Sequence, residues 1–320
     1  MAKLPWSGEQ PVLMLAPMQG LTNRAMRASL IARSAPDLVF TEFVRVQANS
    51  RKRIPRADLA DIRSYSGCVP LVVQLIGHGA EALADAAVIV QDAGADHLNL
   101  NLGCPYGRMT SGATGGVLLR EPAKLAKLLQ ALRAAVRGSF SVKSRAGYDD
   151  PRQIFQLLPV YEEAGVDFLI LHPRTVEQHY RGCADHDITA EVAARTDLPL
   201  IANGDINTAA QGRRILAAGG VAGLMLGRGA LADPLLFRRL RGELPEAVPD
   251  GLRRQEVYAF LDDLLPRYQE LFCGDRQVLM KIKDVLNFIP DEDLQRDLGR
   301  MKRAKEVADF RREMLNLREG

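Results

Sequence analysis

The sequence predicts a (β/α)8 TIM barrel followed by a C-terminal all-helical domain. Short apolar runs alternate with helix-like segments, eight such runs occur, and the alternation stops near residue 245. Alternating strands and helices are typical of parallel β/α units. Eight units over about 235 residues match the usual size of such a barrel. We therefore predict a catalytic barrel over residues 1–245 and a helical domain over residues 246–320.

Each predicted strand is a short apolar run that ends in Gly, Pro or a polar residue. In chain order the runs are VLMLAPM (12–18), LVFTEFV (38–44), LVVQLIG (71–77), HLNLNLGC (97–104), SVKSRAG (141–147), FLILHPR (168–174), PLIANGD (199–205) and GLMLGRGA (223–230). An open doubly wound sheet would alternate in the same way. No GxGxxG follows the first run, however, which weighs against a dinucleotide-binding fold.

The pattern changes at LRGELPEAVPDG (240–251), where Pro and Gly cluster, and only helical periodicity follows. Two groups of basic residues lie in this tail: Lys281 with Lys283, and Arg296, Arg300, Lys302, Arg303 and Lys305. We predict that the tail binds a polyanion.

Composition predicts a globular enzyme without a metal centre or disulfide bonds. The net charge is +3, and 47% of the residues are hydrophobic. The four cysteines (Cys68, Cys104, Cys183 and Cys273) form no C-x-x-C pair and have no His at ligand spacing. No run approaches the ~20 apolar residues of a membrane span, and the N-terminus lacks a signal-peptide pattern. We expect a cytoplasmic monomer that binds no metal and no membrane.

Polar or sulfur-containing residues stand at the ends of all eight runs, where a barrel of this kind builds its active site. They are Met18; Glu42 and Arg45; Gln74; Asn101 and Cys104; Lys143 and Arg145; His172 and Arg174; Asn203 and Asp205; and Gly227 and Arg228. A barrel that served only as a scaffold would not need such a ring.

The last two runs, IANGD and LGRGA, place glycines where backbone N–H groups can close on a ligand, and Arg228 offers a fork for phosphate oxygens. Phosphate commonly binds at this corner of the fold. Alternatively, the glycines only make tight turns. The corner does not distinguish a flavin phosphate from a sugar phosphate.

Gln74 and Lys143 are costly to place near a half-buried barrel mouth unless a ligand satisfies them. An isoalloxazine ring would do so, because its pyrimidine edge pairs with Gln74 and Lys143 can stabilise the negative charge of the reduced ring. A Schiff-base lysine or an ordinary ion pair are the alternatives for Lys143. The turn at APM (16–18) could lie against the face of the flavin.

Cys104 lies on the glycine-rich loop LGCPYGRMTSGATGG (102–116), which we interpret as a mobile lid over the barrel mouth. Strand alternation points Asn99 and Asn101 the same way. An unperturbed thiol is mostly protonated at neutral pH, so Cys104 is suited to donate a proton. Asn101 offers a donor and an acceptor that match an imide such as uracil. Alternatively, Cys104 is a small buried hydrophobe.

Basic residues follow the second run, in RVQANSRKRIPR: Arg45, Arg51, Lys52, Arg53 and Arg56. With Arg108, Arg120 and the basic tail, they predict a positive rim that binds RNA, although a charge run is often only a solvated face. His78, His97, His179 and His186 show no metal or nucleophile pairing, and we expect packing or surface roles for them.

In order, the stretches LAPMQGLTNRAMR, TEFVRV, VVQLIG, NLNLGCP, SVKSRAGYDD, LHPRT, IANGDI and LGRGAL resemble the tRNA-dihydrouridine synthases. The resemblance implies an FMN site formed by Ala16, Pro17, Met18, Gln74, Lys143, His172, Asn203, Gly204, Asp205, Gly227 and Arg228. It implies NADPH, or NADH, as the reductant. It further implies that hydride passes to C6 of a uracil ring while the Cys104 thiol protonates C5.

The same resemblance implies that Asn101 and Arg145 hold the edge of the base, and that Arg45, Lys281, Lys283 and Arg303 position the tRNA. TEFVRV is most similar to the bacterial subfamily that acts at position 16 of the D loop. A loop uridine is a favourable substrate, because flipping a base out of a stack costs a few kcal/mol and less in a loop. Uridines 17, 20 and 20a are alternative targets.

Three other functions remain open at this point. A sugar-phosphate aldolase or isomerase would use Lys143 and the phosphate corner without flavin. A free-pyrimidine FMN oxidoreductase would share the flavin and the cysteine, but it needs neither the basic tract nor the helical tail. A tRNA-binding protein without catalytic activity would need no thiol at Cys104.

Overall fold

The computed structural model describes residues 4–8, 10–105, 114–290 and 292–319. Arg108 and most of the predicted lid loop therefore lie outside the described residues. The chain forms two compact units: Met1–Pro17, Asp37–Asp205 and Arg213–Leu226 in the first, and Met18–Pro36, Ile206–Gly212 and Gly227–Gly320 in the second. The functional division at residues 245 and 246 stays a prediction.

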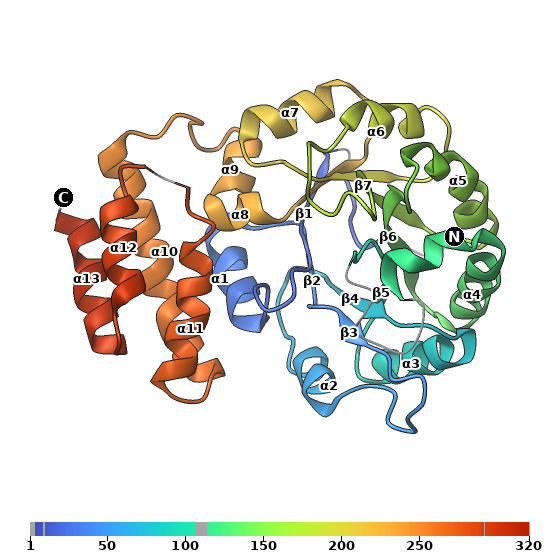
Figure 1. The fold of residues 1–320 in the computed structure, drawn as a ribbon, viewed down its shortest axis with the longest axis horizontal. Helices are drawn as coiled ribbons and strands as arrows, with labels where there is room; N and C mark the ends of the chain where they lie inside the picture. Colours follow the sequence, from blue (N-terminus) through green and yellow to red (C-terminus); the bar gives the residue numbers. More distant parts are fainter. Residues whose placement is uncertain (1–3, 9, 106–113, 291, 320) are drawn as a thin grey trace. The chain divides into compact units, whose positions relative to one another are not determined.

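The first unit confirms the predicted barrel (Figure 1). Its parallel strands are β1 (Val12–Leu15), β2 (Leu38–Phe40), β4 (Leu71–Ile76), β5 (His97–Leu102), β6 (Ser139–Gly147), β7 (Phe168–Thr175), β8 (Leu200–Asn203) and β9 (Gly223–Leu226). They pair in the order β2-β1-β9-β8-β7-β6-β5-β4, and the pairing of β2 with β4 closes the ring. The two-residue strand β3 (Val44–Arg45) extends the pairing along β4.

Helices lie around the outside of these strands (Figure 1). They are α2 (Arg56–Arg63), α3 (Ala80–Asp92), α4 (Pro122–Ala135), α5 (Ile154–Glu163) and α6 (His186–Ala193), with the short 3-10 helices η2 (Gly115–Arg120) and η3 (Pro151–Gln153). Helix α7 (Ala209–Ala217) begins in the second unit and ends in the first. In α3, the buried residues Leu83, Ala86, Ala87 and Val90 recur at helical spacing and form the face that packs inward.

Alternating strand residues build two apolar layers. Phe168 and Ile170 of β7 pack inside the ring with Val12, Met14, Phe40, Val72, Ile201 and Met225. Leu169 and Leu171, the intervening residues, pack on the other side with the apolar faces of the surrounding helices. Because the barrel interior is filled, a ligand site belongs at the strand ends.

The second unit is helical among its described residues. It contains α1 (Arg24–Ser34), α8 (Arg228–Ala232), α9 (Leu236–Leu240), α10 (Asp250–Leu271), α11 (Asp275–Leu286), α12 (Gln295–Arg303) and α13 (Val307–Glu319). Asn23 caps α1, since its Oδ1 accepts hydrogen bonds from the N–H groups of Ala25 and Met26. The all-helical tail predicted from the sequence is thus confirmed.

Buried ion pairs tie the helices of the second unit together. Arg239, which is 3% exposed, lies 3.0 Å from an Asp233 oxygen and 2.5 Å from a Glu256 oxygen. Arg254 of α10 lies 2.7 Å from a carboxylate oxygen of Asp297 in α12. Removal of one partner from such a pair leaves a buried charge without compensation, so these contacts fix which helices are neighbours.

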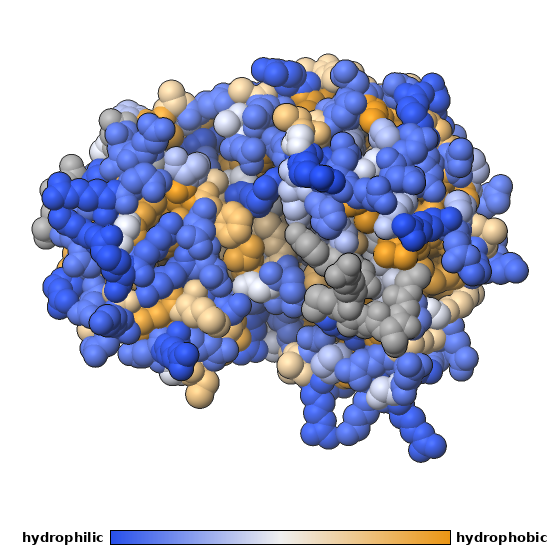
Figure 2. Space-filling model, viewed as in Figure 1, coloured by the Kyte–Doolittle hydropathy of each residue, from blue (hydrophilic) through white to orange (hydrophobic). Residues whose placement is uncertain are grey.

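The described surface is mainly polar. On the face shown in Figure 2, hydrophilic side chains predominate. The large exposed hydrophobic side chains among the described residues are Val88, Tyr180, Leu252, Met280 and Leu315, which come from separate elements. None of the described helices combines the length and apolar character that crossing a membrane requires.

Strands β1 and β9 pack so closely at Gly223 that a larger residue there should destabilise the fold. A Cβ at Gly223 would lie 2.1 Å from the carbonyl oxygen of Val12. We expect Gly223→Ala to lower the free energy of unfolding by about 1–3 kcal/mol, measured by urea denaturation, because the strands must move apart. Gly251→Ala is the matched control, since its Cβ meets nothing within 4 Å. Equal midpoints for Gly223→Ala and the wild type would contradict the spacing of these strands.

Candidate active site

A row of buried amides crosses β4 and β5. Gln74 Nε2 donates to Asn99 Oδ1 at 2.8 Å, and Asn101 Nδ2 donates to Gln74 Oε1 at 2.8 Å. Asn99 Nδ2 in turn donates to Ser141 Oγ on β6 at 2.8 Å. Asn99 and Asn101 thus both contact Gln74, as strand alternation predicts. Because buried polar groups need partners, this row fixes the orientation of each amide.

Asn101 also positions the backbone of Cys104. Its Oδ1 accepts hydrogen bonds from the N–H of Gly103 at 3.0 Å and from the N–H of Cys104 at 2.9 Å. The carbonyl of Cys104 accepts from the N–H of Gly116 at 3.1 Å. The cysteine is half-buried and its thiol is free, whereas Cys68, Cys183 and Cys273 are exposed. Cys104 therefore sits on an anchored backbone at the end of a barrel strand.

Lys143 lies on β6, next to Asn101 in the register of the sheet. Its Nζ donates to Asn203 Oδ1 at 2.8 Å, and Asn203 Nδ2 donates to the carbonyl of Met225 at 2.8 Å. Burial, and to a lesser extent the Arg145 guanidinium, lowers the pKa of Lys143 from 10.5 to about 7, against an opposing effect of Cys104. An anionic ligand beside Lys143 would favour its charged form.

The loops after β7 and β8 are joined by Arg174, which is 2% exposed. Its guanidinium pairs with both carboxylate oxygens of Asp205, at 3.1 and 2.5 Å, and lies 3.1 Å from His172 Nε2. The sequence placed Arg174 at a strand end but suggested no role for it. The fork-to-carboxylate geometry shows that it holds His172 and Asp205 in place.

Arg145, a predicted contact of the base, is 1% exposed. Its Nε donates to the carbonyl of Gly103 at 2.9 Å, and its Nη1 donates to the carbonyls of Thr175 and His179 at 2.7 and 2.6 Å. The side chain therefore ties the loop after β5 to the loop after β7. Its contact with the base stays a prediction.

Tyr180 is an exposed aromatic residue in the loop after β7. Its side chain is 51% exposed, and its ring centroid lies 6.5 Å from that of His172. The Arg145 guanidinium lies 5.4 Å from the ring centroid, a cation–π distance. Tyr180 could not be identified from the sequence, because a single tyrosine in a polar loop does not reveal what it packs against.

The other predicted residues of the first unit lie at three strand ends. The N–H of Ala16, which precedes Pro17, donates to the carbonyl of Leu226 at 2.8 Å. Gly204 and Asp205 follow β8, and both have positive φ, +117° and +50°. Arg45 ends β3, with its guanidinium 5.4 Å from the ring of Phe43.

The second unit holds the remaining predicted residues. Gly227 precedes α8, and Arg228 is exposed at its start. The N–H of Met18 donates to Thr22 Oγ1 at 2.8 Å. Lys281 donates to the carbonyl of Gly20 at 3.2 Å, Lys283 donates to that of Ala304, and Arg303 is exposed. Contacts of these three basic residues with tRNA stay predictions.

Comparison with known structures supports the fold. Histamine dehydrogenase from Rhizobium sp. 4-9 aligns with a TM-score of 0.58 and 11% identity, over 80% of this chain and 48% of that chain. At this identity the likeness shows the barrel fold alone.

Three curated relatives have related names. A probable tRNA-dihydrouridine synthase of Rhodobacter capsulatus is 37% identical over 73% of this chain and 72% of that protein. The tRNA-dihydrouridine(16) synthase of Cupriavidus necator is 36% identical, over 72% of this chain and 73% of that protein. The tRNA-dihydrouridine synthase B of Pseudomonas syringae pv. tomato is 34% identical, over 82% and 77%.

Residues 14–317 match the family described as Dihydrouridine synthase (Dus), so the match spans both compact units. The amide row and Cys104 both lie within the matched residues. The chain therefore belongs to the dihydrouridine synthase family.

Proposed function

We propose that this enzyme reduces uridine 16 in the D loop of tRNA to 5,6-dihydrouridine, with FMN as its cofactor and NADPH as the reductant. One arrangement in the structure supports the proposed reaction in addition to family membership. The backbone of Cys104 is fixed by the same amide, Asn101, that ends the buried row at the strand ends, and Lys143 lies on the neighbouring strand. The proposed proton donor, Cys104, is therefore held beside the polar side chains that would bind the ligand.

The donor set of the first unit fits a flavin. Gln74, Lys143 and Asn203 present amide and ammonium groups that can pair with the carbonyls and ring nitrogens of isoalloxazine. His172 and the loop at Gly204 and Asp205 lie on the next strands. FMN, once reduced by NADPH, would supply the hydride for C6 of the uracil ring.

Cys104 completes the reduction. Its thiol proton goes to C5 as C6 receives the hydride, so the C5=C6 double bond becomes a single bond and a thiolate remains. The thiolate then takes a proton from solvent. A carboxamide NH2 carries two N–H bonds, so Asn101 can hold Gln74 and still donate to a uracil carbonyl.

Two features support tRNA and position 16 as the substrate site. Relatives from Cupriavidus necator and Haemophilus influenzae, at 36% and 37% identity, are named tRNA-dihydrouridine(16) synthases. Arg300, Lys302 and Arg303 lie in the last turn of α12, where positive charge attracts the phosphate backbone of RNA. Arg45 would contribute to the orientation of the tRNA.

Family membership argues against two of the alternatives. A sugar-phosphate aldolase would also profit from a lysine with a lowered pKa, as Lys143 has. A member of the dihydrouridine synthase family is an enzyme with another chemistry, however, and it is not a binding protein without activity. The free-pyrimidine oxidoreductase is left as an outcome of the test.

The test uses the purified full chain with FMN, NADPH and unmodified tRNA transcripts. We expect dihydrouridine in the wild-type transcript and in transcripts with cytidine at position 17, 20 or 20a. Cytidine at position 16 should abolish the product, measured by mapping dihydrouridine along the RNA. Product at another position would overturn the assignment to uridine 16. A chain that cannot be loaded with FMN, or that reduces free uracil at a comparable rate, would overturn the proposed reaction.

A further inference from the structure

The loop after β8 contains two consecutive residues with positive φ, of which only the first is a glycine. Gly204 has φ +117°, and a Cβ there would lie 2.8 Å from His172 Cδ2 and 3.0 Å from Ala184 Cβ. Asp205, which is not a glycine, has φ +50°. A non-glycine residue in this region needs surrounding contacts that hold it. The contacts of this loop therefore determine the direction in which its peptide groups point.

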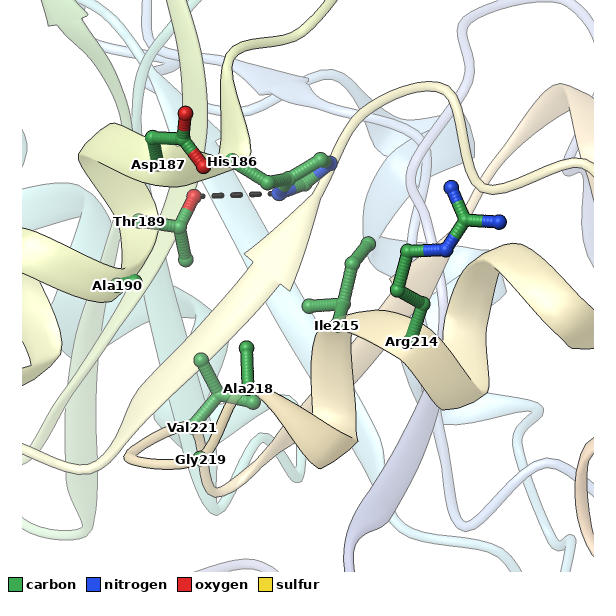
Figure 3. Close-up of a pocket in the computed structure, with 9 residues that line it drawn as sticks. All are labelled: His186, Asp187, Thr189, Ala190, Arg214, Ile215, Ala218, Gly219 and Val221. Atoms are coloured by element: carbon green, nitrogen blue, oxygen red, sulfur yellow. Dashed lines mark hydrogen bonds between the residues drawn. The ribbon is translucent and has the colours of Figure 1, made fainter.

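One of these contacts comes from His186, the first residue of α6. Its Nε2 lies 2.9 Å from the carbonyl oxygen of Gly204. Because a carbonyl oxygen only accepts, Nε2 must carry the hydrogen. The Nδ1 of the same ring lies 3.2 Å from Thr189 Oγ1, and Thr189 is 1% exposed (Figure 3). Both ring nitrogens are thus engaged, and the orientation of the ring is fixed.

A second contact holds the side chain of the next residue. The carboxylate of Asp205 accepts from both guanidinium nitrogens of Arg174 and from the N–H of Ala184 at 2.8 Å. Arg174 and Ala184 therefore fix the carboxylate, while His186 fixes the preceding carbonyl. The peptide between Gly204 and Asp205 is held at both of its ends.

The hydrogen bond to the Gly204 carbonyl also determines the direction of the next N–H, that of Asp205. In a trans peptide the C=O and the following N–H lie in one plane and point in opposite directions. His186 draws the carbonyl of Gly204 toward α6. The N–H of Asp205 is therefore turned away from α6.

We propose that His186 is a positioning residue for the cofactor: by binding the Gly204 carbonyl, it holds the Asp205 N–H so that this N–H donates to the phosphate of FMN. The inference rests on the proposed function and adds to it a residue outside the ring of strand ends. From the sequence, only a packing or surface role was expected for His186. A backbone N–H in a turn is a common donor to phosphate oxygens.

The surroundings of His186 allow it to be replaced. A cavity of about 140 Å³ lies beside the ring. It is lined by residues of α6, of α7 and of the loop between α7 and β9: His186, Asp187, Thr189, Ala190, Arg214, Ile215, Ala218, Gly219 and Val221. Figure 3 shows four residues with apolar side chains in this lining: Ala190, Ile215, Ala218 and Val221. A side chain of similar size at position 186 therefore has room to fit.

The test compares FMN with riboflavin, which has the same ring system but no phosphate. Each flavin is titrated into the flavin-free full chain, with binding followed by flavin fluorescence. The variants are His186→Phe, which keeps an aromatic ring without donors, and His186→Gln, whose Nε2–H can reach the same carbonyl. Val221→Ala is the matched control, because it alters the same cavity without touching a hydrogen bond.

We expect His186→Phe to weaken FMN binding about tenfold, because the Asp205 N–H is no longer held toward the phosphate and one hydrogen bond to a charged group is lost. Riboflavin binding should change less than about twofold, because the affected donor faces the phosphate. His186→Gln should restore most of the FMN affinity, and Val221→Ala should bind both flavins like the wild type.

Equal weakening of both flavins by His186→Phe, or no weakening of either, would overturn the inference while leaving FMN binding by the wild type intact. Failure of His186→Gln to restore FMN affinity would also overturn it. A wild-type chain that binds neither flavin would instead overturn the proposed function, and the inference with it.

Discussion

Replacing Cys104 with alanine is expected to lower the rate of dihydrouridine formation about 100- to 1,000-fold, the usual effect of losing a general acid. In the proposed mechanism the alanine leaves C5 of the uracil without a proton donor, although the backbone hydrogen bond between Asn101 and residue 104 remains possible. Single-turnover measurement of dihydrouridine in tRNA, with the pre-reduced enzyme, isolates this step. The affinity for tRNA should be unchanged.

Cys183→Ala provides the matched control, since Cys183 is also a free cysteine but is exposed. It should form product at the wild-type rate. Product formation by Cys104→Ala within about threefold of the wild type would remove the thiol from the proposed mechanism, because a general acid contributes far more than that.

Lys143→Met is expected to weaken FMN binding about 10- to 100-fold, because hydrogen bonds to charged groups contribute about 1.5–3 kcal/mol. Methionine is an unbranched side chain one atom shorter than lysine, and it keeps neither the charge nor the hydrogen bond to Asn203. Titration of the flavin-free chain with FMN measures the effect. Lys124→Met, a change on the exposed face of α4, should leave FMN affinity unaltered.

The pH dependence of FMN binding gives a sharper readout of the same residue. Since the pKa of Lys143 is about 7 without ligand, its ammonium group loses its proton as the pH rises above 7. Wild-type affinity should therefore fall between pH 7 and 9. Protonation of the FMN phosphate affects the wild type and Lys143→Met alike, so the difference between their profiles isolates Lys143. Parallel profiles would contradict the role of its charge.

The stability of the flavin-free chain should change with pH in the opposite direction. The pKa of Lys143 falls from 10.5 to about 7 on folding, so the unfolded chain binds more protons between these values. The contribution of Lys143 to stability therefore rises as pH increases from 7 toward 10.5. The melting temperature of the wild type, measured by thermal unfolding, should therefore rise relative to that of Lys143→Met over this pH range.

The strands could be predicted because each apolar run ends at a recognisable Gly, Pro or polar residue. The second run was less regular in the structure than its letters suggest. LVFTEFV divides into β2 and β3, because Thr41 Oγ1 accepts the N–H of Gln74 at 3.1 Å. A side-chain oxygen there takes a place that a backbone carbonyl of a continuous strand would occupy. This hydrogen bond could not be predicted from the local sequence, because its two residues are 33 positions apart.

Within the site, the sequence located the residues but not their partners. Periodicity placed Gln74, Asn101 and Lys143 at strand ends, since it reports which face of an element a residue occupies. The carbonyls that bind Arg145 lie 30 and 34 residues further along the chain. His186 likewise reaches Gly204 across 18 residues. Contacts of this kind depend on how loops meet after folding, which no local pattern encodes.

The amide row at the strand ends has a direction. From the N–H of Cys104, each group donates to the next in one sense: Asn101, Gln74, Asn99, Ser141 and finally the carbonyl of Leu98. Reversal of one amide would set two acceptors or two donors face to face, and the conflict would pass along the row to the far end. The direction of the hydrogen bond between Asn99 and Ser141 therefore determines which group donates at each later step of the row, as far as the backbone of Cys104. None of the members of the row can therefore reverse its donor and acceptor roles alone.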